Sequence, residues 1–193
     1  MNKISIRKFI KKTRLNLSSD YVSTNSYAIQ NSFLKNFDYF LQLLEVSNPV
    51  FSLYNSAFNE VDTSLIAEFL KRKNYKFCYP VIDQKNIKFG LYQNDVKFVR
   101  NEEFVEILEP KTYKFIDPDI LIVPLIAFDA NLNRIGMGKG FYDKAIKNLR
   151  SKKKIIAIGL AYYFQYIDRE IETNQFDQKL DFVITEDIIY NLT

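Results

Sequence analysis

The stretch from Ile120 to Phe128 is apolar at nine successive positions, with Pro124 at its centre. A run that does not alternate with polar residues is typical of a strand buried on both faces, as in parallel sheets covered by helices on two sides. Nine residues are too few for a helix that spans a membrane. We therefore expect a buried strand over residues 119–123 at the centre of an α/β fold.

Apolar periodicity predicts helices and strands in alternation along the rest of the chain. Helices are expected over residues 2–17, from the capping residues 18–20 to about residue 44, from residue 64 onward, and over 141–149. Strands are expected over residues 49–54, 76–82, 87–92, 119–123, 154–161 and 182–185. Residues 93–118 are rich in turn signals, and we predict no element there. The alternation favours a mainly parallel sheet, and without repeats or linkers we expect one domain over residues 1–193.

The composition removes several kinds of chemistry. The 193 residues include no histidine, no tryptophan and a single cysteine, Cys78. A serine or cysteine nucleophile activated by histidine is therefore excluded, as are zinc sites built from histidine or paired cysteines and a disulfide within the chain. Carboxylates, lysine, arginine, tyrosine, backbone amides and hard metal ions remain. Cys78 lies in a predicted strand among apolar neighbours, and we expect a small buried side chain there.

Positive charge is concentrated in two short segments. The first 19 residues carry six basic side chains and no acid, and residues 144–154 again carry six without an acid, although the formal net charge of the whole chain is only +4. Local basic patches suit an anionic small molecule or a nucleic acid. A nucleic-acid-binding module is the less favoured alternative, because most aromatic residues follow the helical or strand periodicity expected of core residues. Salt-sensitive binding to oligonucleotides would favour it.

Three of the five glycines lie within five residues, at Gly136, Gly138 and Gly140. This segment follows the buried strand and leads into a predicted helix, the place where ligands bind in an α/β sheet. Glycines let backbone amides approach a phosphate, and the helix N-terminus favours negative charge. Lys139 and Arg134 add cations suited to phosphate oxygens. The spacing matches neither common phosphate-loop motif, so a simple tight turn is the alternative.

Acidic residues near this segment have two interpretations. Asp143 lies in the first turn of the predicted helix. Its negative charge either interacts favourably with the helix dipole or ligates magnesium, which prefers hard oxygen donors. By sequence alone, Asp177 and Asp181 are solvated loop residues. Glu60 precedes a predicted helix start, where an acid is also favourable.

Five segments resemble, in order, the motifs of the 5-formyltetrahydrofolate cyclo-ligase family, whose members are also called 5,10-methenyltetrahydrofolate synthetases. They are KISIR at 3–7, YNSAFNEVDT at 54–63, PLIAFD at 124–129, RIGMGKGFYD at 134–143 and DQKLDFVI at 177–184. The resemblance covers essentially the whole chain. Three departures stand out: the family usually has glycine at Leu125, tyrosine at Phe141, and a segment containing proline and histidine where residues 172–176 lie.

This resemblance implies a three-layer α/β/α sandwich with a mainly parallel sheet. It also implies ATP- and magnesium-dependent conversion of 5-formyltetrahydrofolate to 5,10-methenyltetrahydrofolate, with release of ADP and phosphate. Magnesium would be bound by Asp143 and Asp177, the folate by Asn55 and Glu60, and Arg134 and Lys139 would be catalytic. Binding of ATP would involve Lys3, Arg7, Arg134, Ile135, Gly136, Met137, Gly138, Lys139, Gly140, Phe141 and Tyr142. For Tyr142 a structural role is an equal alternative.

The implied chemistry is compatible with a chain without histidine, because both nucleophiles, the formyl oxygen and nitrogen 10, belong to the substrate. The protein has to align the reacting groups and neutralise developing charge. Another ATP- or phosphate-utilising enzyme on the same scaffold is the alternative within enzymes. The charged N-terminus lacks the apolar segment of a secretory signal, although a basic transit peptide would look similar. We expect a cytoplasmic monomer that acts on small molecules, without nucleic-acid or membrane partners.

Overall fold

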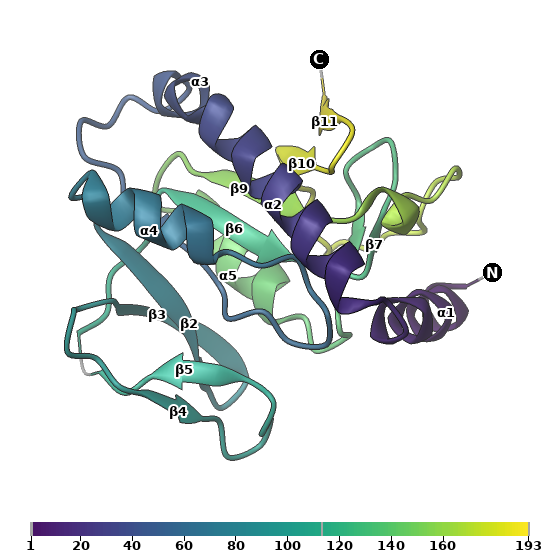
Figure 1. Ribbon diagram of the computed structural model, residues 1–193, viewed down its shortest axis with the longest axis horizontal. Coiled ribbons are helices and arrows are strands. Elements are labelled where there is room, and N and C mark those ends of the chain that lie inside the picture. The colour runs from purple at the N-terminus through teal and green to yellow at the C-terminus, as the bar shows by residue number, and fades with distance from the viewer. Residues whose placement is uncertain (1, 113, 193) are drawn as a thin grey trace.

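The computed structural model describes residues 2–112 and 114–192 and contains a seven-stranded sheet (Figure 1). The strands of this sheet are β1 (Phe51–Ser52), β2 (Phe77–Asp83), β3 (Asn86–Leu91), β6 (Ile120–Pro124), β9 (Ile156–Leu160), β10 (Phe182–Ile184) and β11 (Ile189–Asn191). Their order is β11-β10-β9-β6-β1-β2-β3. The inner strands are parallel, and the edge strands β3 and β11 run antiparallel to their neighbours. The mainly parallel sheet that the sequence predicted is therefore confirmed.

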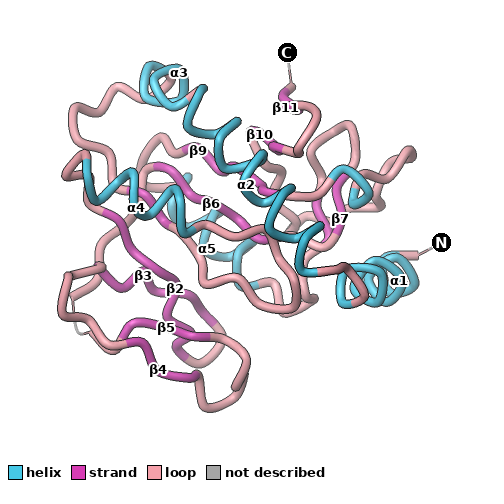
Figure 2. Tube along the Cα trace, viewed as in Figure 1, coloured by secondary structure: helices cyan, strands magenta, loops and turns pink. Residues whose placement is uncertain are grey.

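Helices cover both faces of the sheet, as Figures 1 and 2 show. The helices α2 (Ser19–Lys35), α3 (Phe37–Gln42) and α4 (Ser64–Arg72) pack on one face, and α5 (Phe141–Arg150) packs on the other. The first helix, α1 (Lys3–Leu15), lies beside the sheet against a small hairpin formed by β7 (Ala127–Phe128) and β8 (Arg134–Ile135). A second hairpin, β4 (Phe98–Arg100) with β5 (Leu108–Pro110), lies next to β2. The architecture is the expected three-layer α/β/α sandwich.

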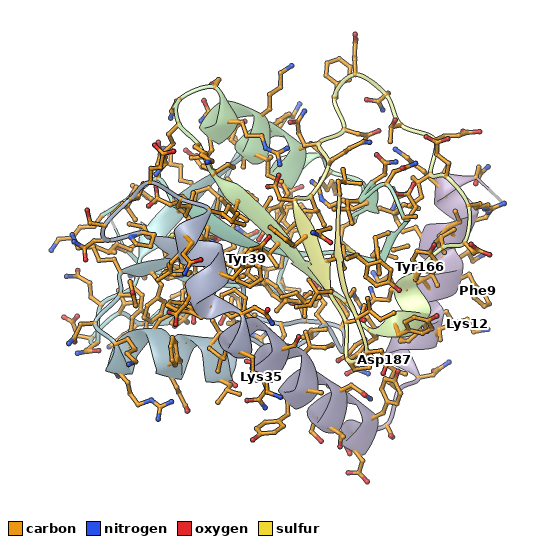
Figure 3. All side chains as sticks on the ribbon, turned by 90° about the horizontal axis from the view of Figure 1, so that it is seen from above. Phe9, Lys12, Lys35, Tyr39, Tyr166 and Asp187 are labelled. Atoms are coloured by element: carbon orange, nitrogen blue, oxygen red, sulfur yellow. The ribbon has the colours of Figure 1, made fainter. Side chains whose placement is uncertain are left out.

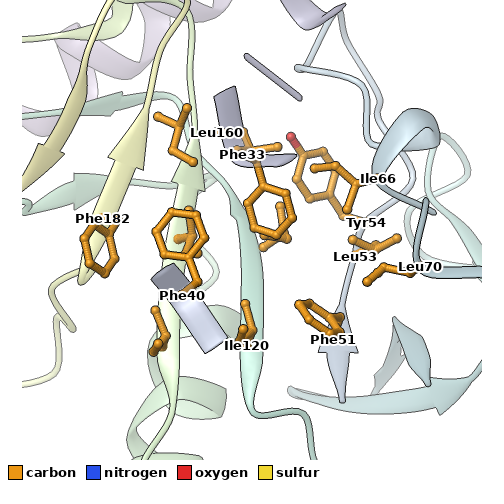
Figure 4. Close-up of a cluster of buried hydrophobic side chains, with 14 of the residues drawn as sticks. Phe33, Phe40, Phe51, Leu53, Tyr54, Ile66, Leu70, Ile120, Leu160 and Phe182 are labelled. Carbon is orange, nitrogen blue, oxygen red and sulfur yellow. The ribbon is translucent and has the colours of Figure 1, made fainter. Parts of the chain in front are cut away.

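Strand β6 explains why the apolar run is unbroken. Ile120 and Ile122 belong to the core cluster beneath α2, α3 and α4, part of which Figure 4 shows. Leu121 and Val123 point into the cluster on the α5 side, so both faces of the strand are buried. Cys78 on β2 is also fully buried, which confirms the expectation for this residue.

One predicted helix is in fact two. Ser18 caps α2 as expected, by accepting a hydrogen bond from the Tyr21 amide at 3.2 Å. The helix then ends at Lys35, and α3 begins after Asn36, whose side-chain amide donates to the Ser32 carbonyl at 2.9 Å. Asparagine competes with helical hydrogen bonding in this way, and periodicity alone does not show the break because apolar spacing continues through it.

The buried face of α1 differs from the expectation. Helical periodicity over residues 2–17 predicts an apolar face of Ile6, Phe9, Ile10, Thr13 and Leu17, with the basic groups mostly on the other face. Phe9 is 60% exposed and, like Lys12, lies on the outer side of the helix in Figure 3. The buried positions are Ile6, Ile10 and Arg14, so a charged residue occupies the inner stripe.

The remaining differences concern short strands. Of the strand expected over residues 49–54, only the two residues of β1 pair in the sheet. Strands β4 and β5 lie within residues 93–118, where no element was predicted, and β11 was not expected either. The hairpin β7–β8 separates β6 from the glycine segment, so the glycines do not follow the buried strand directly. These strands carry two or three residues each, too few to show a clear alternation.

Leu125 shows how the chain accommodates a large residue after Pro124. Its φ angle lies outside the left-handed region, so the backbone does not require glycine there. Its side chain packs over Gly159, where an added Cβ would lie 2.6 Å from Leu125 Cδ2 and 2.7 Å from Leu180 Cδ1. The glycine on β9 therefore leaves the room that Leu125 fills.

We predict that Gly159→Ala lowers the free energy of unfolding by about 1–3 kcal/mol, because it overfills a packed core. Gly136→Ala is the matched control, since Gly136 has no positive φ and an added Cβ there would meet no atom within 4 Å. Urea denaturation of both variants measures the difference. Equal stability of the two variants would contradict the packing argument.

Candidate active site

The site lies between β1 and β6, where the order in which successive strands are added to the sheet reverses direction. From β1 the chain crosses through α4 to β2, and from β6 it crosses through α5 to β9 on the opposite side. In open α/β sheets, ligands bind in the crevice outside the carboxyl ends of the strands at such a switch point. A cavity of about 720 Å³ opens there, lined by Tyr54 and Asn55 after β1 and by Pro124 and Leu125 at the end of β6.

Every residue that the sequence assigned to the site lines this one cavity. The residues are Lys3, Arg7, Asn55, Glu60, Arg134, Ile135, Gly136, Met137, Gly138, Lys139, Gly140, Phe141, Tyr142, Asp143 and Asp177. They come from α1, the loop after β1, the segment from β8 into α5, and the loop before β10. The fold therefore brings together segments that are separated by up to 174 positions in the chain.

The glycine segment is a tight loop between β8 and α5. Gly138 and Gly140 have φ angles of 92° and 69°, a region that favours glycine, and Gly140 is the N-cap of α5. Arg7 Nε donates a hydrogen bond to the Gly136 carbonyl at 2.8 Å. Its guanidinium also lies against Gly138, where a Cβ would approach Arg7 Cζ to 3.3 Å. The loop therefore depends on glycine for its shape and on α1 for its position.

Arg134 and Asp143 form an ion pair at the cavity wall. Arg134 Nη2 lies 2.9 Å from Asp143 Oδ1, and Arg134 Nη1 donates to the carbonyl of Gln178. The Gln178 amide donates to Asp143 Oδ1 at 3.0 Å. Burial lowers the pKa of Arg134 below its usual value, while the Asp143 carboxylate opposes this shift. Much of this guanidinium is therefore engaged in joining the start of α5 to the loop before β10.

Asp177 is held by α1. Lys3 Nζ donates to Asp177 Oδ2 at 2.7 Å, and the Asn174 amide donates to the same oxygen at 2.8 Å. Partial burial alone would raise the pKa of Asp177, but these hydrogen bonds and the charges of Lys3 and Arg134 lower it below its usual value. The side chain is therefore ionised at neutral pH, and it is not the free solvated acid that its loop position suggested.

The two aspartates suit a magnesium ion that is shared with phosphates. In residues 2–112 and 114–192, no three acidic or cysteine side chains cluster into a ready-made metal site. Magnesium usually takes only one or two carboxylates and completes its shell with phosphate oxygens and water. Asp143 Oδ2 and Asp177 Oδ1 accept no hydrogen bond from the described residues, so each aspartate has an oxygen available. The donor set therefore fits this cation.

Glu60 and Asn55 lie in the loop after β1. Glu60 Oε2 accepts a hydrogen bond from the Ala57 amide at 3.2 Å, and Oε1 lies 3.3 Å from Arg14 Nη2. Burial raises the pKa of Glu60, whereas Arg14 opposes this shift. Asn55 Nδ2 donates to the Leu108 carbonyl at 2.8 Å and so ties this loop to the β4–β5 hairpin.

The β4–β5 hairpin contributes cavity residues that the sequence did not identify. Phe104, in its loop, meets the Phe141 ring edge-on at 5.9 Å between centroids, and Lys139 Nζ lies 5.2 Å from the centre of the Phe104 ring. Further apolar lining comes from Pro80 and Ile82 on β2, from Ile87 on β3, and from Ile107 and Leu108 of the same hairpin. No periodicity marks Phe104, Ile107 and Leu108, because they belong to the turn-rich segment over residues 93–118.

Tyr142 has a buried hydroxyl with no hydrogen-bond partner among the described residues. Burial and the charge of Glu60 raise the pKa of Tyr142 above its usual value, so the phenol keeps its proton. A native buried hydroxyl nearly always has a partner, and Tyr142 is among the residues that line the cavity. Contact with a bound molecule and a structural role therefore stay the two interpretations of this residue.

Some of the cations in each basic segment pair with acids from elsewhere in the chain. In the second segment, Arg150 pairs with Asp181, Lys152 with Asp117 and Lys153 with Asp119. In the first, Lys3 pairs with Asp177 and Arg14 with Glu60, while Arg7 binds the Gly136 carbonyl. These pairs reduce the positive surface that a nucleic acid would need. The described helices include none long and apolar enough to cross a membrane.

The fold and site together define an α/β protein with a ligand cavity at the switch point and a lysine- and glycine-containing loop at the start of a helix. The profile of the 5-formyltetrahydrofolate cyclo-ligase family matches residues 1–186. The chain belongs to this family.

Relatives and solved structures agree with this assignment. The 5-formyltetrahydrofolate cyclo-ligase of Haemophilus influenzae is 45% identical over 62 residues, and that of Mycoplasma genitalium is 44% identical over 68 residues. These alignments cover 32% and 35% of this chain but only 32% and 39% of the relatives. The 5,10-methenyltetrahydrofolate synthetase structure from Aquifex aeolicus matches with a TM-score of 0.80 and 25% identity, over 99% of this chain and 93% of that one. The structure of the Mycoplasma pneumoniae synthetase matches with a TM-score of 0.72 and 26% identity, over 97% and 100%.

We predict that Tyr142→Phe leaves the free energy of unfolding unchanged or raises it by up to about 1 kcal/mol, because the lost hydroxyl is buried without a partner. Tyr54→Phe is the matched control, since the Tyr54 hydroxyl donates to the Val61 carbonyl at 2.7 Å. That variant should lose about 0.5–1.5 kcal/mol. Denaturation curves of the two variants compare them, and an equal loss in both would show that Tyr142 has an internal partner.

Proposed function

We propose that this protein is a 5-formyltetrahydrofolate cyclo-ligase, which converts 5-formyltetrahydrofolate and ATP to 5,10-methenyltetrahydrofolate, ADP and phosphate. The observation that carries the proposal is the convergence, on one cavity, of every residue that the resemblance assigned to the site. Chance similarity of short motifs would not require segments so distant in sequence to meet. Membership of the family and the full-length structural matches support the same activity.

The proposed reaction has two steps. The formyl oxygen on nitrogen 5 attacks the γ-phosphorus of ATP, the bond to the β-phosphate oxygen breaks, and ADP leaves. Nitrogen 10 of the same folate then attacks the formyl carbon, the carbon–oxygen bond breaks, and phosphate leaves with the electron pair. Loss of the nitrogen 10 proton gives the methenyl bridge. No side chain has to form a covalent bond, which is consistent with the absence of histidine.

The nucleotide phosphates would lie at the glycine loop. Gly138 and Gly140 open the backbone there, the α5 N-terminus favours negative charge, and Lys139 supplies an exposed ammonium group. Lys3 and Arg7 add positive charge from α1. We propose that Lys139 neutralises charge that develops on the transferred phosphoryl group, and that Arg134 adds charge while it holds Asp143.

Magnesium would be held by Asp143 and Asp177 together with phosphate oxygens. When bound, it would neutralise phosphate charge and orient the transferred group. The chain's own contribution is to hold both carboxylates in place. Arg134 does this for Asp143, and Lys3 does it for Asp177.

The folate would occupy the apolar part of the cavity. A flat pterin ring suits the walls formed by Ile82, Ile107 and Phe104. The Glu60 carboxylate would accept hydrogen bonds from its amino and ring N–H groups, and Asn55 would contact the same molecule from the loop after β1. The buried Tyr142 hydroxyl would gain the partner that it lacks among the described residues.

The proposal is tested by mixing the purified protein with 5-formyltetrahydrofolate and magnesium-ATP and following the near-ultraviolet absorbance of 5,10-methenyltetrahydrofolate. Omission of ATP, and separately of magnesium, provides the controls. A rise that requires both components is expected. No rise from folded protein that binds ATP would instead indicate a phosphate-utilising enzyme with another acceptor.

We predict that Lys139→Ala lowers kcat/KM by about 100-fold, the usual loss when one donor to a developing negative charge is removed. The free energy of unfolding should change by less than about 0.5 kcal/mol, because Lys139 is exposed. Lys154→Ala, at another exposed lysine that does not line the cavity, should change neither quantity appreciably. Parallel losses of activity and stability in Lys139→Ala would assign this lysine a structural role.

A further inference from the structure

Helix α1 carries a stripe of basic residues that reaches four segments around the cavity. Lys3, Arg7 and Arg14 are spaced by four and seven positions, which places them on one side of a helix. Lys3 binds Asp177 before β10, and Arg7 binds the glycine loop. Arg14 binds the loop after β1 and the turn after β6. The first two residues lie in the family's N-terminal motif, whereas Arg14 lies outside every motif that identified the site.

The Arg14 guanidinium is only 1% exposed, and each of its nitrogens has a partner. Nε donates to the Phe58 carbonyl at 2.9 Å, and Nη1 donates to the Leu125 carbonyl at 3.1 Å. Nη2 lies 3.3 Å from Glu60 Oε1. A planar guanidinium with three directed contacts fixes the orientation of the groups around it. Arg14 therefore joins the Glu60 carboxylate to the backbone at the ends of β1 and β6.

The backbone before Glu60 needs such support. Phe58 and Asn59 both have positive φ angles, 55° and 56°, although neither is glycine. Arg14 contacts this turn twice, because its side chain binds the Phe58 carbonyl and its own carbonyl accepts a hydrogen bond from Asn59 Nδ2 at 3.0 Å. Strained turns of this kind persist only where the surroundings hold them.

The charges around Glu60 also depend on Arg14. Burial raises the pKa of Glu60, and Arg14 opposes this shift together with the Ala57 amide and the charge of Lys11 on α1. The other titratable groups that face Glu60 are the hydroxyls of Tyr54 and Tyr142, and both keep their protons because burial raises their pKa values. Among the facing side chains, Arg14 is therefore the main group that opposes the rise in the pKa of Glu60.

We propose that Arg14 is a positioning residue that sets the orientation and charge of Glu60 for recognition of the folate ring. This inference rests on the proposed role of Glu60. The competing interpretation is that Arg14 only supports the core. The two interpretations differ in what removal of the guanidinium should change, since a core residue would affect stability without selecting one substrate.

The test compares Arg14→Lys and Arg14→Met with Arg150→Met, which removes the Arg150–Asp181 pair outside the cavity. In Arg14→Met, the KM for 5-formyltetrahydrofolate should rise by about tenfold or more, as expected for a lost charge-assisted contact, while the KM for ATP changes by less than about twofold. The acidic limb of the kcat/KM profile should move to higher pH, because Glu60 would then protonate more readily.

Arg14→Lys should restore the pH profile more fully than the KM, since lysine supplies charge without three directed contacts. Arg150→Met should behave as wild type in these assays.

Non-additivity gives a second criterion. Glu60→Gln in the Arg14→Met background should add little to the rise in folate KM, because the two residues act as one unit. Equal rises in both KM values, an unmoved acidic limb in Arg14→Met, or full additivity with Glu60→Gln would overturn the proposal. Because Arg14→Lys keeps the charge, it serves as the test variant if Arg14→Met does not fold.

A measurement without substrate separates this inference from the proposed function. Carboxyl ¹³C NMR on protein labelled at glutamate follows the titration of Glu60. The Glu60 signal is assigned by its absence from the spectrum of Glu60→Gln. Its midpoint should be higher in Arg14→Met than in wild type, and an unchanged midpoint would overturn the proposal. If wild type shows this coupling but no folate turnover, the proposed function fails while the coupling between Arg14 and Glu60 stands.

Discussion

Because helices cover both faces of β6, its backbone can pair only within the sheet, with β1 on one side and β9 on the other. Ile120 and Ile122 face one core, and Leu121 faces the other. This double burial forces the chain to cross to opposite faces from β1 and β6, and the crevice between their carboxyl ends follows from it. The cavity, the glycine loop and the start of α5 are all placed by this single strand.

Ion pairs across distant segments then shape the cavity. Lys3 with Asp177, Arg14 with Glu60, and Arg134 with Asp143 each join two parts of the chain. Partly buried pairs add little net stability, because desolvation offsets much of their attraction, but breaking one leaves a charge uncompensated. Their main effect here is to define where each carboxylate lies. A chain without histidine can thereby present oriented acidic side chains beside a lysine and backbone amides.

Periodicity predicted the layers well because long apolar patterns report burial directly. It failed where the pattern is short or where one residue interrupts it, as at Asn36, at the two-residue strand β1 and in the β4–β5 hairpin. The motif residues of the site could all be named from the sequence by resemblance. Arg14 and Phe104 could not, since Arg14 resembles any basic residue of an amphipathic helix and Phe104 lies in a segment without periodicity.

The sequence by itself determined the kind of fold, the chemistry available and the segments that carry the site. Those properties depend on residue types and local spacing, such as the apolar run at β6, the three clustered glycines and the absence of histidine. Only the tertiary structure decided which charges pair, that Phe9 faces outward while Arg14 is buried, and that the β4–β5 hairpin forms a wall of the cavity. Pairing and burial depend on contacts between residues far apart in the chain, and local patterns carry no information about such contacts.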